Sequence, residues 1–476
     1  MAVSQSNGKR GASGRLMAAI AAGKLAGIAS RAFGRGGGTA LPGVLAERID
    51  PRLVEQLAAQ VGHGSVMVTG TNGKTTTAHM LSSVAAKAGY LPLHNRSGSN
   101  LMRGVATSLL DQSGPLGRLF QAERRLGIFE VDEATLPEAV AAVKPRVLIF
   151  TNLFRDQLDR YGEVDSIAAR WRDTLQAAPE STTVVLNADD PSVAALEASA
   201  RGRVVFCGVD DRAPALDEPE HAADSRWCPD CGREYDYDLL FYGHVGHWRC
   251  PGCDRSRPEP DLRATRVLLE ADSTHLSVAT PQGVVELSLR LSGLYNAYNA
   301  LAALAGGLEL GIGAAVVCEG IEAVAAAFGR QERFEIDGRH VQVFLGKNPA
   351  GLNQVLRTIA ALPGDKRLLL LLNDDIADGR DISWIWDADF ELLAGKATSV
   401  VACGRRAEDM ALRLKYAGFP PDLPVIGSAA EALDLALRQT PAGGDLYVLP
   451  TYTAMLEVRA LLARRGGVAP YWEEQP

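Results

Sequence analysis

A buried strand that leads into a glycine-rich loop and then a helix is the feature that most constrains the fold of this chain. Residues 65–69 are largely apolar, and Gly70-Thr71-Asn72-Gly73-Lys74-Thr75-Thr76 follows directly. The backbone N–H groups of such a loop, with a helix N-terminus behind them, form a cradle for phosphate oxygens. The loop has the short G-x-x-G-K-T form, because Val68 stands where the longer phosphate loop has glycine. The pattern predicts an ATP site, with Lys74 at the β and γ phosphates and the Thr75 hydroxyl on Mg²⁺.

Short apolar strands alternate with helical stretches after this loop, which predicts a parallel sheet with helices on both faces. A second α/β unit begins near Arg339. We expect the strands at residues 65–69, 126–131, 147–151, 183–187, 203–207, 341–345, 367–372, 399–402 and 446–449, with a helix over 296–311.

At 476 residues the chain is too long for one compact core. We expect a basic N-terminal segment over residues 1–42, an ATP-binding domain over 43–335, and a smaller C-terminal α/β domain over 336–476.

Four of the seven cysteines form two C-x-x-C pairs, Cys228/Cys231 and Cys250/Cys253. Two such pairs supply four thiolates, which is the ligand set of a closed, tetrahedral Zn²⁺ site. We predict a structural zinc ribbon inserted over about residues 222–260. His244 and His247 lie nearby and are interpreted as structural or exposed, because the four thiols already complete a site.

Composition narrows the functional classes. The net charge of −8 argues against broad nucleic-acid binding. We expect a cytoplasmic protein, because basic residues and glycines interrupt every apolar run near the N-terminus and no apolar run reaches bilayer length. Residues 1–40 hold six Lys or Arg and no acidic residue. Residues 15–35 are either an amphipathic helix that turns Arg15, Lys24, Arg31 and Arg35 toward anionic lipid, or a leader helix packed on the body.

Further motifs follow the phosphate loop in an order that resembles the superfamily of Mur ligases and folylpolyglutamate synthases. Asn187-Ala-Asp-Asp-Pro191 is similar to the family's segment near the nucleotide. Gly293-Leu-Tyr-Asn-Ala-Tyr-Asn299 resembles its adenine motif, with Tyr295 in place of histidine, and Gly329-Arg-Gln-Glu-Arg333 resembles its arginine-bearing joint. The resemblance implies that ATP phosphorylates a carboxylate and that an amine attacks the acyl phosphate, with Asn296 and Arg330 at the nucleotide.

The same resemblance implies that Glu130 is a Mg²⁺ ligand, whereas Asp132 and Glu133 are interpreted as solvated ends of a strand. Gln157 stands where the family has a metal-binding histidine, and Arg170 falls near its carbamoylated lysine. A second Mg²⁺ site of the usual kind is therefore in doubt.

Departures from the superfamily point to one branch of it. Fewer than 70 residues precede Gly70, which is too few for a separate nucleotide-sugar domain. This short front, the four cysteines, Lys347-Asn-Pro-Ala-Gly351 and Asp378-Gly-Arg-Asp-Ile-Ser-Trp-Ile-Trp-Asp387 resemble the MurT family, the ligase subunits of lipid II isoglutaminyl synthase. That resemblance implies lipid II as substrate, a GatD-like glutaminase as partner in a heterodimer, and Asp381 as the residue that completes the partner's catalytic triad.

The remaining cysteines, Cys207, Cys318 and Cys403, lie in no nucleophile motif, so ammonia is expected from outside the chain. We therefore expect Lys74, Glu130 and Asp381 to carry the chemistry. Two alternatives stay open, namely a ligase that adds an amino acid and a nucleotide-binding scaffold that has lost catalysis.

Overall fold

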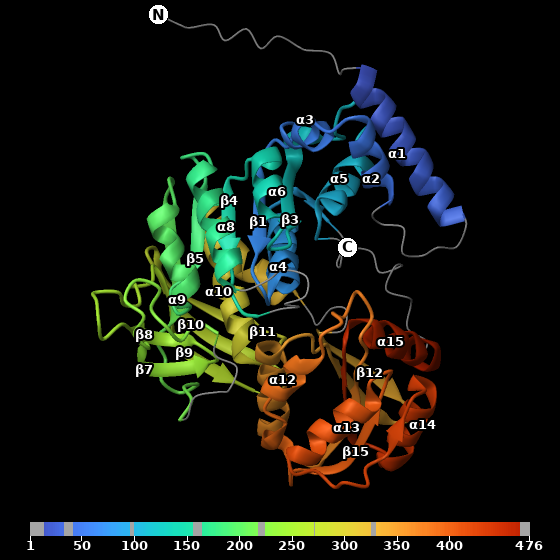
Figure 1. Cartoon of the computed structure of the whole chain (residues 1–476). Coiled ribbons are helices and arrows are strands. Elements are labelled where there is room, and N and C mark those ends of the chain that lie inside the picture. Colours follow the sequence, from blue (N-terminus) through green and yellow to red (C-terminus); the bar gives the residue numbers. More distant parts are fainter. Residues whose placement is uncertain are drawn as a thin grey trace, which may run out of the picture.

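The computed structural model describes residues 14–32, 41–95, 100–155, 164–217, 224–270, 272–324 and 330–466. Over these residues the strands form sheets of nine, six and two strands. Figure 1 shows the domain with the nine-stranded sheet in blue to yellow and the C-terminal domain, in orange and red, beneath it.

The nine-stranded sheet places the phosphate loop at its middle. β1 pairs in parallel with β3 on one side and β4 on the other, and the last three strands close one edge as antiparallel pairs. The strand order is β11-β10-β9-β6-β5-β4-β1-β3-β2. The bounds are β1 (Ser65–Thr69), β2 (Leu91–His94), β3 (Arg125–Glu130), β4 (Val147–Phe150), β5 (Thr183–Asn187), β6 (Val204–Val209), β9 (Leu262–Leu269), β10 (Thr274–Thr280) and β11 (Gly283–Leu289).

Helices cover both faces of this sheet, because successive side chains of a buried strand point to opposite sides. Val66 and Val68 pack with the helices of one face, α4 (Lys74–Lys87), α10 (Leu294–Glu309) and α11 (Ala314–Glu322). Met67 packs on the other face with α6 (Leu136–Val143), α8 (Val164–Ala177), α9 (Pro191–Ala194) and the 3-10 helix η2 (Ala195–Ser199). The α/β fold class is confirmed, and the five strands predicted for this domain agree within two residues at each end.

A small helical unit precedes and flanks the sheet. It comprises α1 (Gly14–Ala32), α2 (Leu41–Ile49), α3 (Leu53–Ala58) and α5 (Met102–Asp111), and the 3-10 helix η1 (Ala122–Arg124) follows it. Thr107 accepts a hydrogen bond from the Gly43 N–H at 3.0 Å, and a Cβ atom at Gly43 would lie 2.2 Å from the Arg103 carbonyl oxygen. Helices α2 and α5 therefore pack at a distance that only glycine allows.

Helix α1 packs on the body of the protein, as one of the two alternatives expected. Arg15 donates to the Ile49 carbonyl and Lys24 to the Ser113 carbonyl, so these two cations turn toward the protein. Arg35 lies outside the described residues, as does the side chain of Arg31. Among the described helices, none is both long and apolar enough to cross a membrane.

The cysteine module is an insertion between β6 and β9. Its two antiparallel strands are β7 (Asp236–Tyr242) and β8 (Val245–Arg249). Tyr235 and Trp248 pack into the core of the first domain beneath α8 and α9, so the module shares that core.

The second sheet has the order β12-β13-β17-β14-β15-β16, and β12 pairs antiparallel while the others are parallel. Leu368 and Leu370 pack on one face and Leu369 and Leu371 on the other. The domain boundary expected between residues 335 and 336 falls inside β12, which begins at Arg330 and ends at Ile336. The strands are β12 (Arg330–Ile336), β13 (Arg339–Phe344), β14 (Lys366–Leu371), β15 (Ala397–Cys403), β16 (Val425–Ile426) and β17 (Asp445–Pro450), and the helices are α12 (Pro349–Ala361), η3 (Ser383–Asp387), η4 (Phe390–Leu393), α13 (Ala407–Tyr416), α14 (Ala429–Gln439) and α15 (Tyr452–Gly466).

Candidate active site

The phosphate loop joins β1 to α4 through two glycines with left-handed backbone. Gly70 has a φ of 128° and Gly73 a φ of 88°. A Cβ atom at Gly70 would lie 2.1 Å from the Thr151 hydroxyl, and one at Gly73 would lie 2.0 Å from Oδ1 of Asn299. Side chains are therefore excluded at both positions, and the backbone N–H groups of the loop stay accessible to a phosphate.

Residues 151–154, which follow β4, hold the loop in place. The Thr71 hydroxyl donates to the Phe154 carbonyl at 3.0 Å and accepts from the Phe154 N–H at 2.9 Å. Asn152 accepts from the Asn72 N–H at 2.9 Å and donates to the Asn72 carbonyl at 3.1 Å. Four hydrogen bonds between two adjacent strand ends fix the loop before any nucleotide binds.

Lys74 is buried and paired with Glu133. Its Nζ lies 2.9 Å from Oε1 of Glu133 and also donates to the Gly70 carbonyl. Both side chains are about 5% exposed. The interpretation of Asp132 and Glu133 as solvated strand ends is therefore wrong, because both are buried and Glu133 supplies the counter-ion of the loop lysine.

Glu130 ends β3 beside the loop, and its carboxylate fits a metal ligand. Asn95 accepts from the Glu130 N–H at 2.9 Å and donates to its carbonyl at 2.8 Å, which fixes the backbone. Oε2 of Glu130 is buried and has no hydrogen-bond partner among the described residues. A buried carboxylate oxygen without a partner is costly unless a cation neutralises it, and Mg²⁺ prefers oxygen ligands. Glu130 and Thr75 would hold that ion, which would neutralise charge on the phosphates.

Replacing Glu130 with glutamine is expected to stabilise the metal-free protein while impairing Mg²⁺-dependent ATP turnover. A neutral amide of the same shape removes a buried, unpaired charge, which is worth about 1–3 kcal/mol. The matched control is Glu133→Gln, which removes the partner of Lys74 and is expected to destabilise the protein. Thermal unfolding with and without MgATP measures both effects. If both variants changed the melting temperature in the same direction and by the same amount, the assignment of Glu130 as a Mg²⁺ ligand would be contradicted.

A cleft lies between the phosphate loop, α10 and the C-terminal domain. Asn296 and Asn299 line it from α10, and Lys347 and Gln331 line it from the second domain. Asn296 donates to the Ser292 carbonyl at 2.8 Å and accepts from Asn299 at 3.2 Å. Gly73, Thr75 and Thr76 line it from the loop and the start of α4, and Tyr295 lines it from α10. The cleft thus joins the phosphate loop to the motif that resembles an adenine site.

The joint between the domains is built around Gln331, a residue that the sequence analysis did not single out. It has a φ of 59°, its Nε2 donates to the Tyr295 hydroxyl at 2.6 Å, and its Oε1 accepts from the Ser292 N–H at 3.0 Å. Tyr295, the departure from the histidine of the family motif, therefore anchors the joint. Arg330 lies in β12 next to Gln331, but its side chain is outside what the structure describes.

Two polar contacts link the phosphate-loop region to the C-terminal domain. Asn348 donates to Oδ1 of Asn72 at 3.1 Å, and its own Oδ1 caps α12 by accepting from the Gly351 N–H at 2.8 Å. Arg155 lies 3.2 Å from the carboxylate of Asp387, which ends η3. The Lys347–Gly351 and Asp378–Asp387 motifs therefore both reach the loop region of the first domain.

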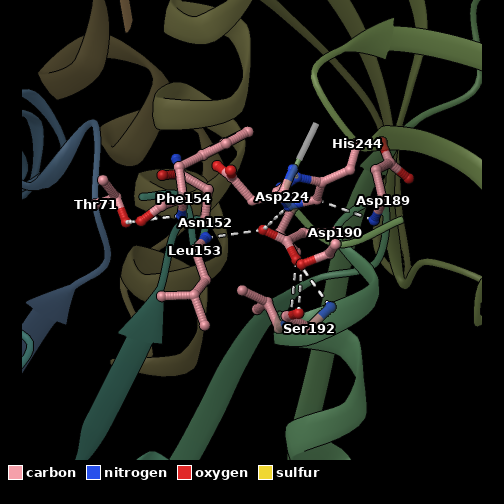
Figure 2. A network of polar contacts seen from close by, with 12 residues as sticks. Thr71, Asn152, Leu153, Phe154, Asp189, Asp190, Ser192, Asp224 and His244 are labelled. Atoms are coloured by element: carbon pink, nitrogen blue, oxygen red, sulfur yellow. Dashed lines mark hydrogen bonds and ion pairs between the residues drawn. The ribbon is translucent and has the colours of Figure 1, made fainter. Parts of the chain in front are cut away.

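A polar network links the phosphate loop to the cysteine module (Figure 2). Asp190 accepts from the Leu153 N–H at 2.8 Å and caps α9 by accepting from the Ser192 N–H at 2.9 Å. Nε2 of the buried His244 lies 3.4 Å from Asp190, and Nδ1 of His244 accepts from the Asp224 N–H at 3.3 Å. His244 thus has a structural role, and the Asn187–Pro191 motif supports the segment that holds the loop.

Gln157 lies outside the described residues, and Arg170 is exposed on α8.

The four cysteine sulfurs of the inserted module lie within 4.8 Å of one another. Cys228 and Cys253 are 3.6 Å apart, and Cys231 and Cys250 are 3.3 Å apart. Tetrahedral Zn²⁺ with Zn–S bonds of about 2.3 Å needs sulfurs roughly 3.8 Å apart, so the cluster is close to that geometry. All four thiolates would hold the ion, which leaves no open position for catalysis.

We predict one Zn²⁺ per chain, measured by elemental analysis of the purified protein. Cys228→Ser is expected to lose the ion and to lower the melting temperature, since metal binding energy contributes to folding. Cys318→Ser, outside the cluster, is the control and should keep the metal. A fully folded, metal-free wild-type protein would refute the assignment.

Asp381 is exposed and lies on the loop before η3. Its Oδ1 accepts from the Ser383 N–H at 2.8 Å. Hydrogen bonds from the backbone and side chain of Ser383 lower the pKa of the Asp381 carboxyl below its usual value. The neighbouring Asp378 is buried instead and accepts from the Thr453 N–H at 2.7 Å. Asp381 is therefore an ionised carboxylate at neutral pH that is held in place and open to a partner.

Comparison with known proteins places this site in a class. The model of the Mur ligase middle domain matches residues 68–227, and the model of the MurT ligase C-terminal domain matches residues 345–455. A pseudomurein peptide ligase type C from Methanothermus fervidus has a similar fold, with a TM-score of 0.64 at 21% identity over 84% of this chain and 79% of that one. MurF from Acinetobacter baumannii has a TM-score of 0.62 at 18% identity over 89% and 79%. The fold and the phosphate site define a ligase of the Mur type.

Two curated relatives carry the assignment further. The MurT subunit of lipid II isoglutaminyl synthase (glutamine-hydrolyzing) from Staphylococcus aureus strain COL is 33% identical over 94% of this chain and 98% of its own length. The subunit of the same name from Streptococcus pneumoniae strain R6 is 34% identical over 90% and 93%. The chain belongs to the family of MurT ligase subunits.

Proposed function

We propose that this chain uses ATP to amidate the α-carboxylate of D-glutamate in the lipid II stem peptide, which gives D-isoglutamine. A carboxylate oxygen attacks the γ phosphorus of ATP, and ADP leaves. The nitrogen of ammonia then attacks the acyl carbon, loses a proton, and displaces phosphate. The names of the relatives and the match to the MurT ligase C-terminal model support this reaction.

The phosphoryl step rests on the phosphate loop. Charge on a moving phosphoryl group has to be neutralised by fixed cations, because the protein contributes mainly positioning and electrostatic stabilisation. Lys74 is the buried ammonium of the loop, and Glu130 and Thr75 are the proposed Mg²⁺ ligands. Glu133 keeps Lys74 paired at 2.9 Å until phosphates arrive.

Ammonia is proposed to come from a GatD-like glutaminase that binds the C-terminal domain. The cysteines outside the zinc cluster are poor nucleophiles: burial raises the pKa of Cys207 to about 12 and of Cys403 to about 11, and it also raises the pKa of Cys318. The single observation that carries the proposal is the combination of a formed phosphate loop with the exposed, hydrogen-bonded Asp381 in a chain of the MurT family. The proposed place of action is the cytoplasmic face of the membrane, where lipid II is made.

Co-purification of the chain with candidate glutaminases, followed by amidation of lipid II, tests the proposal. Product should form with glutamine only when the glutaminase is present, and with high ammonium in its absence. A ligase that adds amino acids would use a free amino acid in place of ammonium, and a scaffold without catalysis would hydrolyse no ATP with lipid II. Either result would contradict the proposal and favour the corresponding alternative.

A further inference from the structure

Helix α1 is apolar on two sides, although the described residues of the protein cover only one of them. Its inner face packs on the body, where Leu16 and Ile20 are at most 2% exposed. Its outer face carries Met17, Leu25 and Ile28, which are 36%, 66% and 59% exposed, together with the exposed Ala18 and Ala21. A surface helix of a soluble domain normally turns charged residues outward, so an outward apolar face indicates something that covers it.

Segments that neighbour α1 carry further exposed apolar side chains. Leu41 and Leu45 of α2 are 53% and 37% exposed, and Leu116 and Phe120, which follow α5, are 65% and 52% exposed. Nζ of Lys24 lies 5.7 Å from the Phe120 ring centroid, which ties α1 to this turn. Seven of the sixteen exposed large hydrophobic side chains in the described residues lie in this helical unit or in the segment that follows α5. We call these seven residues, Met17, Leu25, Ile28, Leu41, Leu45, Leu116 and Phe120, the outer face.

Charge identifies what would cover the outer face. Helix α1 contains no acidic residue, and the first 40 residues of the chain hold six Lys or Arg and no Asp or Glu. Apolar side chains flanked by basic ones are the composition of helices that lie on anionic bilayers.

The glutaminase is a poor candidate for the occupant. Figure 1 shows α1 at the opposite end of the molecule from α13 and β15. η3, which holds the end of the Asp378–Asp387 motif, contacts α12 and α13 of the C-terminal domain. A glutaminase that docks at Asp381 is therefore expected to be centred on the C-terminal domain, whereas α1 belongs to the first domain.

We infer that the outer face lies on an anionic lipid bilayer and presents the active site to a membrane-bound substrate. This inference rests on the proposed function for the identity of the substrate, but the binding itself can be measured without it. Arg15 and Lys24 turn toward the protein. An amphipathic helix on a bilayer would instead turn its basic residues toward the lipid headgroups. Apolar side chains make the contact instead, and the basic N-terminal region adds attraction.

Flotation of the full chain with vesicles tests the inference. Vesicles of phosphatidylglycerol and phosphatidylcholine, without lipid II, should bind the wild type, and vesicles of phosphatidylcholine alone should bind it more weakly. The variant Leu25→Gln/Ile28→Gln should bind the anionic vesicles roughly tenfold more weakly, because two exposed side chains no longer enter the apolar boundary. The control variant Leu268→Gln/Val284→Gln changes side chains that are 45% and 67% exposed on the β9–β11 edge, and it should bind like wild type.

Activity separates this inference from the proposed function. The Leu25→Gln/Ile28→Gln variant should amidate detergent-solubilised lipid II at the wild-type rate with ammonium, yet amidate vesicle-embedded lipid II more slowly. The inference would be overturned if the wild-type protein did not bind anionic vesicles. It would also be overturned if the Leu25→Gln/Ile28→Gln variant bound them as strongly as the wild type. A concentration-dependent dimer that the same substitutions abolish, measured by sedimentation, would instead assign the face to a second copy. Vesicle binding without any amidation would refute the proposed function alone.

Discussion

Lys74→Ala is expected to lower ATP-dependent amidation by at least about 10²-fold, whether glutamine or ammonium supplies the nitrogen. Lys74 is the cation that the phosphate loop supplies, and the hydrogen bonds from Thr71 and Asn72 to residues 152–154 hold that loop in place. Removing the ammonium takes away the cation of the loop that would neutralise developing phosphoryl charge. Initial rates at saturating ATP and lipid II measure the loss.

The ion pair with Glu133 makes a stability control necessary. Lys74→Ala leaves a buried carboxylate without its cation, which costs about 3–5 kcal/mol when a buried pair is broken on one side. The double variant Lys74→Met/Glu133→Gln removes both charges and is expected to recover most of that stability. It should remain inactive. A stable double variant that turns over ATP at the wild-type rate would refute the role of Lys74.

Features encoded by local sequence were predictable. The phosphate loop from Gly70 to Thr76 can be recognised from sequence because each residue type has its own role in phosphate binding. Glycine permits the loop backbone, lysine binds the phosphates, and threonine binds Mg²⁺. The C-x-x-C pairs predict a group of four neighbouring thiols, because their spacing brings the thiols together. Five strands of the first domain, β1 and β3 to β6, were predicted because they are short apolar runs between polar segments. β9–β11 were missed, since each exposes many side chains at the sheet edge and lacks a continuous apolar run.

Features that depend on distant partners were not predictable. Glu133 follows a strand end, where carboxylates are usually solvated, but it is buried beside Lys74, which lies 59 positions away in the chain. The Trp171 ring N–H of α8 also donates to the Glu133 carbonyl at 3.3 Å. The Asn95 clamp on Glu130 spans 35 positions. The sequence left two alternatives open for α1, and in the one where basic residues turn to lipid it could not show that carbonyl groups of α2 and of the segment after α5 bind Arg15 and Lys24.

The largest effect is expected at Asp381, and it should be confined to one nitrogen source. A carboxylate that orients the imidazole of a catalytic triad fixes its tautomer, and its loss can cost on the order of 10⁴ in turnover. Asp381 is exposed, ionised and held by Ser383, and it lies on the C-terminal domain rather than among the residues that line the nucleotide cleft. Asp381→Asn, mixed with wild-type glutaminase, should therefore lose amidation driven by glutamine.

An assay with ammonium in place of glutamine distinguishes a role of Asp381 in glutamine hydrolysis from a role in the ligase reaction. Because Lys74 and Glu130 are untouched, Asp381→Asn should amidate lipid II at the wild-type rate when high ammonium replaces glutamine. The control is Asp374→Asn in the segment after β14, which should retain both activities. Co-purification with the glutaminase should be unchanged in Asp381→Asn, which separates a lost triad residue from a lost interface. Equal failure with both nitrogen sources would place Asp381 in the ligase chemistry or in folding, and the assignment to the glutaminase would be wrong.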